Sequence, residues 1–98
     1  MRNDKEIFKL HSELCKVFSD PNRLEILSIL GNKSKTVSDL VLATGLRQAN
    51  VSQHLAILRA KKVVKSKRDG KQIIYSISDV RLLKAMGILR NILKSQLK

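Results

Sequence analysis

Residues 36–62 read Thr-Val-Ser-Asp-Leu-Val-Leu-Ala-Thr-Gly-Leu-Arg-Gln-Ala-Asn-Val-Ser-Gln-His-Leu-Ala-Ile-Leu-Arg-Ala-Lys-Lys, and this stretch decides the fold. Its apolar side chains recur at spacings of three and four, which place them on one face of a helix. Two such faces are present: Val37, Leu40 and Val41, and then Val51, Leu55 and Leu58. Gly45 lies between them, and glycine takes the left-handed conformation beyond a helix end without steric cost. We therefore expect two short helices that meet at Gly45.

The second of these helices has a polar face opposite its apolar stripe, made of Gln48, Asn50, Gln53, His54 and Arg59. Glutamine and asparagine can make two hydrogen bonds to adenine in the major groove, where the second helix of a helix-turn-helix lies. This pattern favours a DNA-binding helix-turn-helix. The stretch alone leaves open an ordinary helical hairpin whose polar face meets only water.

The composition is that of one small globular domain. The chain has 98 residues, of which 43% are hydrophobic, and this fraction excludes a disordered protein. No apolar run approaches the roughly 18 residues of a membrane span, and no secretory signal pattern is present. One cysteine and one proline exclude a disulfide scaffold and fit a reducing compartment. We therefore expect a cytoplasmic protein.

The charge is large and unevenly distributed. Twenty Lys and Arg against eight Asp and Glu give a formal net charge of +12. Residues 1–49 hold eight basic and six acidic side chains, net +2, whereas residues 50–98 hold twelve and two, net +10. Such a field favours a polyanionic partner, and we expect double-stranded DNA. A membrane surface is disfavoured, since the basic residues cluster on a predicted hairpin and not on an amphipathic helix with aromatic anchors.

Two further helices are expected before the central stretch. The first covers residues 4–18, with one apolar stripe made of Ile7, Leu10, Leu14 and Val17. Asp20 suits the cap of the second helix, and Pro21 suits its first turn, where no N–H is needed. Its core stripe is Leu24, Leu27 and Leu30. Gly31 ends this helix, and residues 31–35 read as a loop.

A hairpin and a last helix are expected after the central stretch. Val63–Lys67 and Ile73–Ile77 are β-rich runs on either side of Asp69-Gly70, a dipeptide typical of a two-residue turn. Ser78 or Asp79 is placed to cap a helix that continues to about Leu97.

The predicted fold is therefore mainly α with a small β-hairpin: a winged helix-turn-helix in a single domain, residues 1–98. The order is four helices, two strands and a fifth helix. A recognition helix reads base edges, and a basic hairpin can lie along the phosphate backbone or reach the minor groove. The residues that we expect to contact DNA are Arg47, Gln48, Asn50, Ser52, Gln53, His54, Lys65, Lys67, Arg68 and Lys71.

The two terminal helices, about 4–18 and 79–97, carry more apolar surface than one small domain can bury. In the last helix one broad stripe comprises Leu82, Leu83, Met86, Leu89, Leu93 and Leu97, and Ile88 and Ile92 form another. A second apolar face indicates a partner. We expect a homodimer whose interface includes Ile7, Leu10, Leu14, Leu82, Met86, Leu89 and Leu93.

Nearly the whole chain resembles the ArsR (ArsR/SmtB) family of small prokaryotic winged-helix transcriptional repressors. The matching segments are Phe-Ser-Asp-Pro-Asn-Arg-Leu-Glu-Ile-Leu (18–27), Val-Ser-Asp-Leu (37–40), Gln-Ala-Asn-Val-Ser-Gln-His-Leu-Ala-Ile-Leu-Arg (48–59) and Asp-Gly-Lys-Gln-Ile-Ile-Tyr-Ser-Ile (69–77). Each segment is weak alone, but the set in this order is specific. The resemblance implies a homodimer that binds an imperfect inverted repeat, usually as a repressor, with the first and last helices at the dimer interface.

The sequence departs from the metal sensors of this family. The family's cysteine box would fall on residues 36–40, which contain no cysteine, and the last helix contains no histidine. His11 and Cys15 are four apart on one helix and could chelate a metal, or they could lie at a dimer interface. Two ligands per chain do not make a closed site, so we expect no metal and no cofactor. The family often has a serine cap at the position of Arg47, which could instead meet a phosphate.

The sequence is less compatible with two other classes of function. An enzyme is not expected, because the sequence has no glycine-rich phosphate loop, no activated nucleophile and no carboxylate pair in a cleft-forming context. A sequence-indifferent architectural DNA-binding protein is the alternative that the charge alone would support. Such a protein would more often carry Lys and Arg on its recognition helix than Gln48, Asn50 and Gln53.

Overall fold

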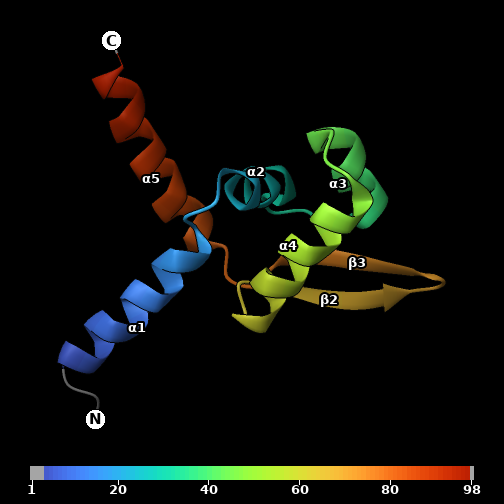
Figure 1. The fold of residues 1–98 in the computed structure, drawn as a ribbon, viewed down its shortest axis with the longest axis horizontal. Helices are drawn as coiled ribbons and strands as arrows, with labels where there is room; N and C mark the ends of the chain where they lie inside the picture. The colour runs from blue at the N-terminus through green and yellow to red at the C-terminus, as the bar shows by residue number, and fades with distance from the viewer. Residues whose placement is uncertain (1–3, 98) are drawn as a thin grey trace.

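The computed structural model describes residues 4–97 and confirms the winged helix-turn-helix. Its elements follow the order α1 (Asp4–Val17), α2 (Pro21–Leu30), β1 (Lys35–Thr36), α3 (Val37–Thr44), α4 (Gln48–Ala60), β2 (Val64–Asp69), β3 (Gln72–Ile77) and α5 (Arg81–Gln96). Helices α2, α3 and α4 form a central body with the hairpin of β2 and β3 beside it (Figure 1).

One strand was not predicted. Residues 31–35 read as a loop, yet Lys35 pairs with Tyr75 and Thr36 with Ile74. This adds β1 to the hairpin and makes an antiparallel sheet of order β1-β3-β2. Two residues are too few for a periodic signal, and this strand exists only because β3 pairs with it.

The core lies where α2, α3 and α4 meet. Leu27, Leu40 and Leu55, one from each helix, are fully buried. The predicted apolar faces of α3 and α4 point into this core, which confirms both helices. The prediction for α2 needs one correction: Leu24 is 36% exposed, and Ile26 is fully buried in its place. Apolar residues occur all around α2, so the sequence did not indicate which side would meet the body.

Side-chain caps mark where two helices, α2 and α3, begin. The Asp20 carboxylate accepts hydrogen bonds from the backbone N–H groups of Asn22 and Arg23, as predicted. Thr36 and Asp39 form a reciprocal capping box at α3. The start of α5 differs from the prediction, because the helix begins at Arg81. Asp79 nevertheless accepts the Arg81 backbone N–H, at 2.9 Å, and also binds the Arg81 guanidinium.

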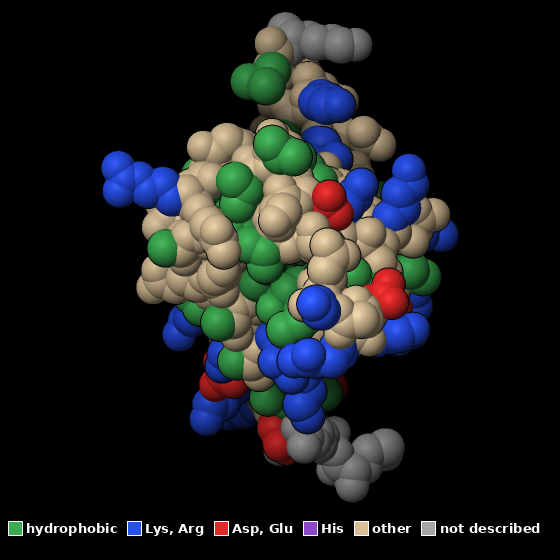
Figure 2. Space-filling view, turned by 90° about the vertical axis from the view of Figure 1, so that its right-hand side faces the viewer, with side chains coloured by type: hydrophobic (Ala, Val, Ile, Leu, Met, Phe, Trp, Pro, Cys, Tyr) green, Lys and Arg blue, Asp and Glu red, His purple; other side chains and the backbone are tan. Residues whose placement is uncertain are grey.

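The hairpin turn lies one residue later than predicted. Asp69 pairs with Gln72, so the two central residues are Gly70 and Lys71 and not Asp69 and Gly70. Only Gly70 has a positive φ, +62°, as the first central position of a type II′ turn requires. Figure 2 looks at the end of the molecule toward which the hairpin points, and basic side chains stand around the middle and lower part of that face.

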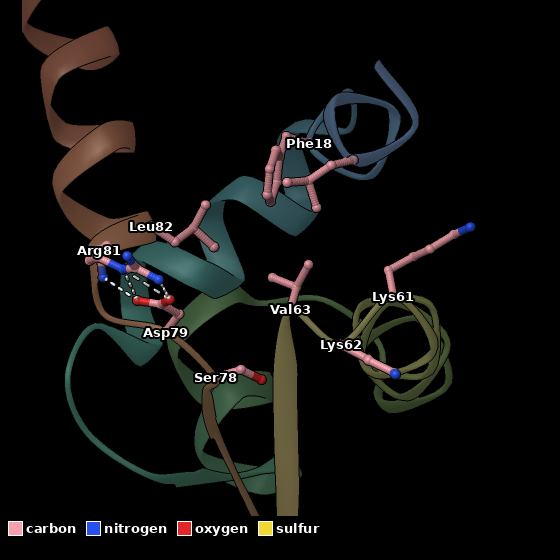
Figure 3. Close-up of a pocket in the computed structure, with 9 residues that line it drawn as sticks. Phe18, Lys61, Lys62, Val63, Ser78, Asp79, Arg81 and Leu82 are labelled. Atoms are coloured by element: carbon pink, nitrogen blue, oxygen red, sulfur yellow. Dashed lines mark hydrogen bonds and ion pairs between the residues drawn. The ribbon is translucent and has the colours of Figure 1, made fainter. Parts of the chain in front are cut away.

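The corner between α4 and β2 contains an unusual residue. The N–H of Val63 donates to the carbonyl of Leu58, and that of Lys62 donates to the carbonyl of Arg59. This is the Schellman motif, whose left-handed position normally holds glycine. Here Lys62 occupies it with φ +62°. Figure 3 shows this corner, with Lys61 and Lys62 extending away from the buried Val63.

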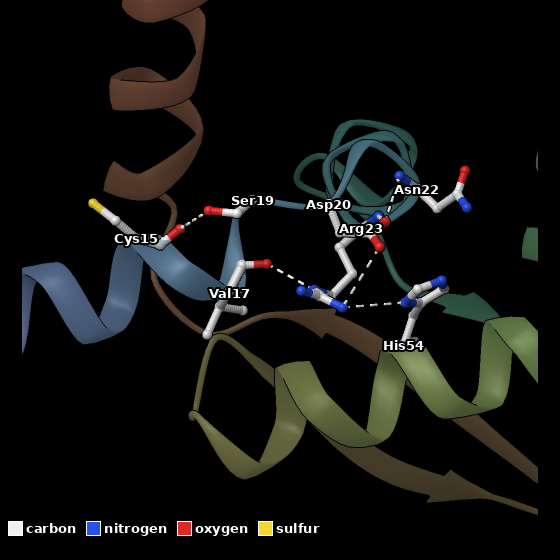
Figure 4. Close-up of polar contacts among 7 residues, drawn as sticks. All are labelled: Cys15, Val17, Ser19, Asp20, Asn22, Arg23 and His54. Atoms are coloured by element: carbon white, nitrogen blue, oxygen red, sulfur yellow. Dashed lines mark hydrogen bonds and ion pairs between the residues drawn. The ribbon is translucent and has the colours of Figure 1, made fainter.

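A polar link centred on Arg23 joins the end of α1 to α2 and α4 (Figure 4). Arg23 Nε donates to the carbonyl of Val17 at 2.7 Å, and Arg23 Nη1 lies 3.9 Å from the Asp20 carboxylate. The same nitrogen lies 3.5 Å from His54 Nδ1, which accepts from it when that nitrogen carries no proton. The Arg23 side chain, on α2, therefore connects this helix to both α1 and α4.

Helices α1 and α5 leave the body in opposite directions at its left side (Figure 1). The radius of gyration of 14.7 Å exceeds the value of about 13 Å that is typical of a compact domain of this size. No helix within residues 4–97 is long and apolar enough to cross a membrane.

We expect Lys62→Gly to stabilise the protein by about 0.5–1 kcal/mol. The left-handed conformation costs a residue with a side chain about 1–2 kcal/mol, and glycine's greater freedom in the unfolded chain offsets about 0.5–1 kcal/mol of that relief. Urea unfolding at fixed protein concentration measures the change. Lys61→Gly is the control, because Lys61 has φ −90° and gains nothing from glycine. Equal effects of both variants would show that Lys62 is not strained.

We expect Arg23→Met to lower the free energy of unfolding by about 1–3 kcal/mol, because it removes a charge-assisted hydrogen bond to the Val17 carbonyl. Arg59→Met is the matched control: Arg59 is exposed on α4 and should change stability by less than about 0.5 kcal/mol. If the two variants lose the same stability, Arg23 does not hold the helices together.

Candidate nucleic-acid interface

The outer face of α4 is exposed to solvent and includes two small side chains. Val51, Leu55 and Leu58 are fully buried, so Ala49, Gln53 and Ala56 face away from the core on the opposite side. The two alanines have short side chains, which lets the helix backbone come close to a groove. An α-helix of this kind fits the major groove of B-DNA, which is about 12 Å wide.

The expected base-reading side chains lie at the start of this helix. Gln48, Asn50, Ser52 and Gln53 are all exposed. Within residues 4–97 none of the four makes a side-chain hydrogen bond, so their donors and acceptors are available to a ligand. The N-terminal part of a recognition helix is the part that usually contacts base edges.

Arg47 stands immediately before α4, at its N-cap, and makes no side-chain cap. The free N–H groups of the first turn therefore remain unsatisfied by this residue. A helix N-terminus attracts anions, and the exposed Arg47 guanidinium adds a full positive charge beside it. This combination suits a phosphate of the DNA backbone.

His54 lies differently from its neighbours. The sequence placed it on the outer face with Gln53, but the structure turns it toward α2, where it is half-buried against Arg23. One residue step on a helix turns the side chain by about 100°, enough to leave the outer face. Its contact with Arg23 gives it a role in placing α4 (Figure 4).

The hairpin presents four basic side chains: Lys65, Lys67, Arg68 and Lys71. All four are exposed. None of them has a carboxylate partner in the part of the chain that the structure describes. Unpaired exposed cations keep their charge available for phosphates. Asp69 is the one acidic residue of this hairpin.

A groove connects the hairpin to α3 and α4. It has a volume of about 390 Å³ and is lined by Thr36, Val37, Ser38, Ser52, Lys71, Gln72, Ile73 and Tyr75. The groove therefore brings Ser52 of the recognition helix and Lys71 of the hairpin, both predicted, to one place. Ser38, Gln72 and Tyr75 were not predicted for this site, since only the pairing of β1 with β3 brings them beside Ser52.

The expected dimer-interface residues divide into two groups. Ile7, Leu10, Leu14, Leu89 and Leu93 are exposed in the single chain. Met86 is buried in the chain's own core, and Leu82 packs partly against that core. Met86 therefore anchors α5 to the body, and it also lines a hollow together with Leu89 and Leu93.

The histidine and cysteine of α1 do not form a ligand set with other residues. His11 and Cys15 are both exposed. Among residues 4–97, no three His, Cys, Asp or Glu side chains are grouped so that they could share a metal ion.

Asp79 and Arg81 form a tight pair at the start of α5. The Arg81 guanidinium lies 2.6 Å from the Asp79 carboxylate, and this hydrogen bond, together with the Arg81 backbone N–H, lowers the pKa of Asp79 to about 2. Asp79 therefore stays ionised at all ordinary pH values, and its carboxylate is paired with the Arg81 guanidinium.

Known proteins resemble this chain in sequence and in fold. A family model described as "Bacterial regulatory protein, arsR family" matches residues 20–66. The uncharacterized HTH-type transcriptional regulator Rv0081 of Mycobacterium tuberculosis is 34% identical over 88 residues, which are 89% of this chain and 77% of the relative. The HTH-type transcriptional repressor SmtB of the same species is 36% identical over 78 residues, 80% of this chain and 58% of SmtB.

Solved structures agree with this relationship. The crystal structure of Rv0081 has a TM-score of 0.83 at 34% identity and covers 93% of this chain and 92% of that one. The homodimeric winged helix-turn-helix domain Mb0332 of Mycobacterium bovis has a TM-score of 0.84 and covers 98% of this chain and 91% of that one; at 20% identity it shows a shared fold. This chain therefore belongs to the arsR family of bacterial regulatory proteins, which are DNA-binding transcriptional regulators.

Proposed function

We propose that this chain acts as a homodimeric repressor that binds an inverted-repeat operator in the cytoplasm. The observation that carries the proposal is the exposed, unbonded set of Gln48, Asn50 and Gln53 on α4, beside the unpaired cations of the hairpin. Amides have no charge to offer phosphates, so their contribution is to distinguish bases. The repressor role is supported by the relative SmtB, which is named a transcriptional repressor.

Helix α4 and the hairpin of β2 and β3 would make different kinds of contact with DNA. Gln48, Asn50, Ser52 and Gln53 would read base edges in the major groove, and Arg47 would hold a phosphate at the helix N-terminus. The hairpin cations Lys65, Lys67, Arg68 and Lys71 would bind the backbone regardless of sequence. This is a binding function, and the proposal includes no catalytic step.

The dimer is proposed from the two helices that leave the body. Leu89 and Leu93 are 63% and 58% exposed, and Ile7 on α1 is 49% exposed. Helices of 14 and 16 residues are marginally stable without tertiary contacts, so α1 and α5 need a surface to pack on. A second copy offers the same apolar faces, and a twofold axis would bring both pairs of helices together. The two recognition helices would then face two half-sites, which explains an inverted repeat.

We expect Gln48→Ala and Asn50→Ala to weaken operator binding by about 1–3 kcal/mol for each lost bidentate contact, and to leave non-specific binding nearly unchanged. Lys67→Ala with Arg68→Ala should weaken binding to all DNA and flatten the plot of log K against log salt concentration by about 0.9 per lost phosphate contact. Titration of a selected operator and a scrambled duplex at several salt concentrations measures both effects.

The same titration separates the proposal from an architectural role. A sequence-indifferent protein would bind both duplexes alike, and the amide variants would then change nothing. If the hairpin variant loses only operator binding, or if the amide variants lose both duplexes equally, the division of work between α4 and the hairpin is wrong.

We expect the double variant Leu89→Glu, Leu93→Glu to be monomeric and to lose operator affinity, because two carboxylates per chain would enter an apolar interface. Sedimentation at micromolar concentration measures the state of assembly. Leu42→Glu is the matched control, since Leu42 is 85% exposed on α3, away from both terminal helices. A wild-type chain that sediments as a monomer would contradict the dimer.

A further inference from the structure

A pocket of about 350 Å³ lies where the end of α1, the corner between α4 and β2, and the link from β3 to α5 meet (Figure 3). We call it the corner pocket. Its volume lies within the range of about 300–1,000 Å³ that is typical of small-molecule sites. It is distinct from the groove beside Ser52 and shares no residue with the expected DNA contacts, whereas two of its lining residues, Leu14 and Leu82, also belong to the expected dimer interface.

One side of the corner pocket is apolar. Phe18 and Leu14 come from the end of α1, Leu82 from the first turn of α5, and Val63 from the corner itself. Phe18 and Leu82 are half-buried, so each leaves part of its side chain open to the pocket. Such a wall favours the hydrocarbon body of a ligand.

The rim of the corner pocket is positively charged. Lys61 and Lys62 are both exposed, and neither has a carboxylate partner among the described residues. The carboxylate of Asp79 does not compensate them, since Arg81 already holds it at 2.6 Å. The Ser78 hydroxyl makes no hydrogen bond within residues 4–97, although the Ser78 backbone N–H is bonded to Val63. Lys61 and Lys62 extend away from Val63 in this structure (Figure 3), so an anion at the pocket would be held only after both flexible side chains turn toward the Ser78 hydroxyl.

Lys62 provides an independent reason to look for a ligand here. It occupies the left-handed position of a Schellman motif, where glycine would be more stable. Departures from the locally preferred residue tend to occur at functional sites. A lysine at this strained position is explained if its ammonium group binds a ligand. Its four-carbon stem is flexible, so the ammonium can turn over the mouth of the pocket.

We propose that the corner pocket binds a small organic anion. The apolar body of the ligand lies against Phe18, Val63 and Leu82, and its anionic group is held by Lys61 and Lys62 with a hydrogen bond from Ser78. This proposal does not rest on DNA binding and can fail or succeed separately from it.

The test uses two fluorescent probes with the same ring system, anilinonaphthalene sulfonate and the uncharged phenylnaphthylamine, titrated into the wild-type chain. The sulfonate should bind more tightly than the neutral probe. The double variant Lys61→Met, Lys62→Met should weaken sulfonate binding by about tenfold and leave the neutral probe unchanged, because only the charge-assisted contacts are lost. Amide chemical shifts should place the sulfonate at Val63, Ser78 and Leu82.

Two controls locate the effect. Lys33→Met with Lys94→Met removes the same charge from residues that line neither the corner pocket nor its surroundings, and should leave both probes unchanged. Arg90→Met changes the other apolar hollow, formed by Phe18, Leu24, Met86, Leu89, Arg90 and Leu93, and should also leave the sulfonate affinity unchanged. Circular dichroism confirms that each variant is folded.

The proposal is overturned if the folded Lys61→Met, Lys62→Met variant binds the sulfonate within about twofold of wild type, or if Arg90→Met removes the binding. It is also overturned if this lysine pair changes only the salt dependence of DNA binding, since the two ammonium groups would then serve phosphates of the duplex.

Discussion

The meeting of three leucines in the core is the contact on which the rest of the structure depends. Leu27, Leu40 and Leu55 bring α2, α3 and α4 together and exclude water completely. Full burial of a leucine contributes about 1.5–3 kcal/mol. With Leu55 fixed inward, Gln53 must point outward, since the two differ by about 200° around the helix. The exposed face of α4, which we propose contacts DNA, is therefore a consequence of the core. The hydrogen bonds of Arg23 with the Val17 carbonyl and His54 connect α4 to α1 and α2.

Both ends of α4 hold a basic residue where a neutral one would suit the backbone better. Arg47 stands at the N-cap without a side-chain cap, at a cost of about 1 kcal/mol relative to serine. Lys62 stands beyond the other end in the left-handed conformation. Neither departure improves packing, since both side chains are exposed. The two ends differ in surroundings: Arg47 lies beside the amides of the recognition helix, whereas Lys62 lies at the corner pocket.

Helices α1 and α5 leave apolar faces that the proposed partner would cover. Their apolar faces project from the body, and only residues near the body, such as Val17 and Met86, are buried. Association would cover these faces and would also set the distance between two recognition helices. Stability and DNA affinity would then depend together on protein concentration.

The sequence alone determined the helices whose apolar residues recur at a regular spacing. Spacings of three and four predicted every helix, and an aspartate before a proline predicted the cap at Asp20, because these features act over a few residues. It did not determine β1, the Gly70–Lys71 turn or the buried side of α2, since each depends on a partner elsewhere in the chain. The candidate site divides in the same way: the amides and hairpin cations were predictable from residue type. The contact of His54 with Arg23, the burial of Met86 in the core and the pocket beside Lys62 were decided only by tertiary packing, because a side chain's surroundings are made by segments distant in sequence.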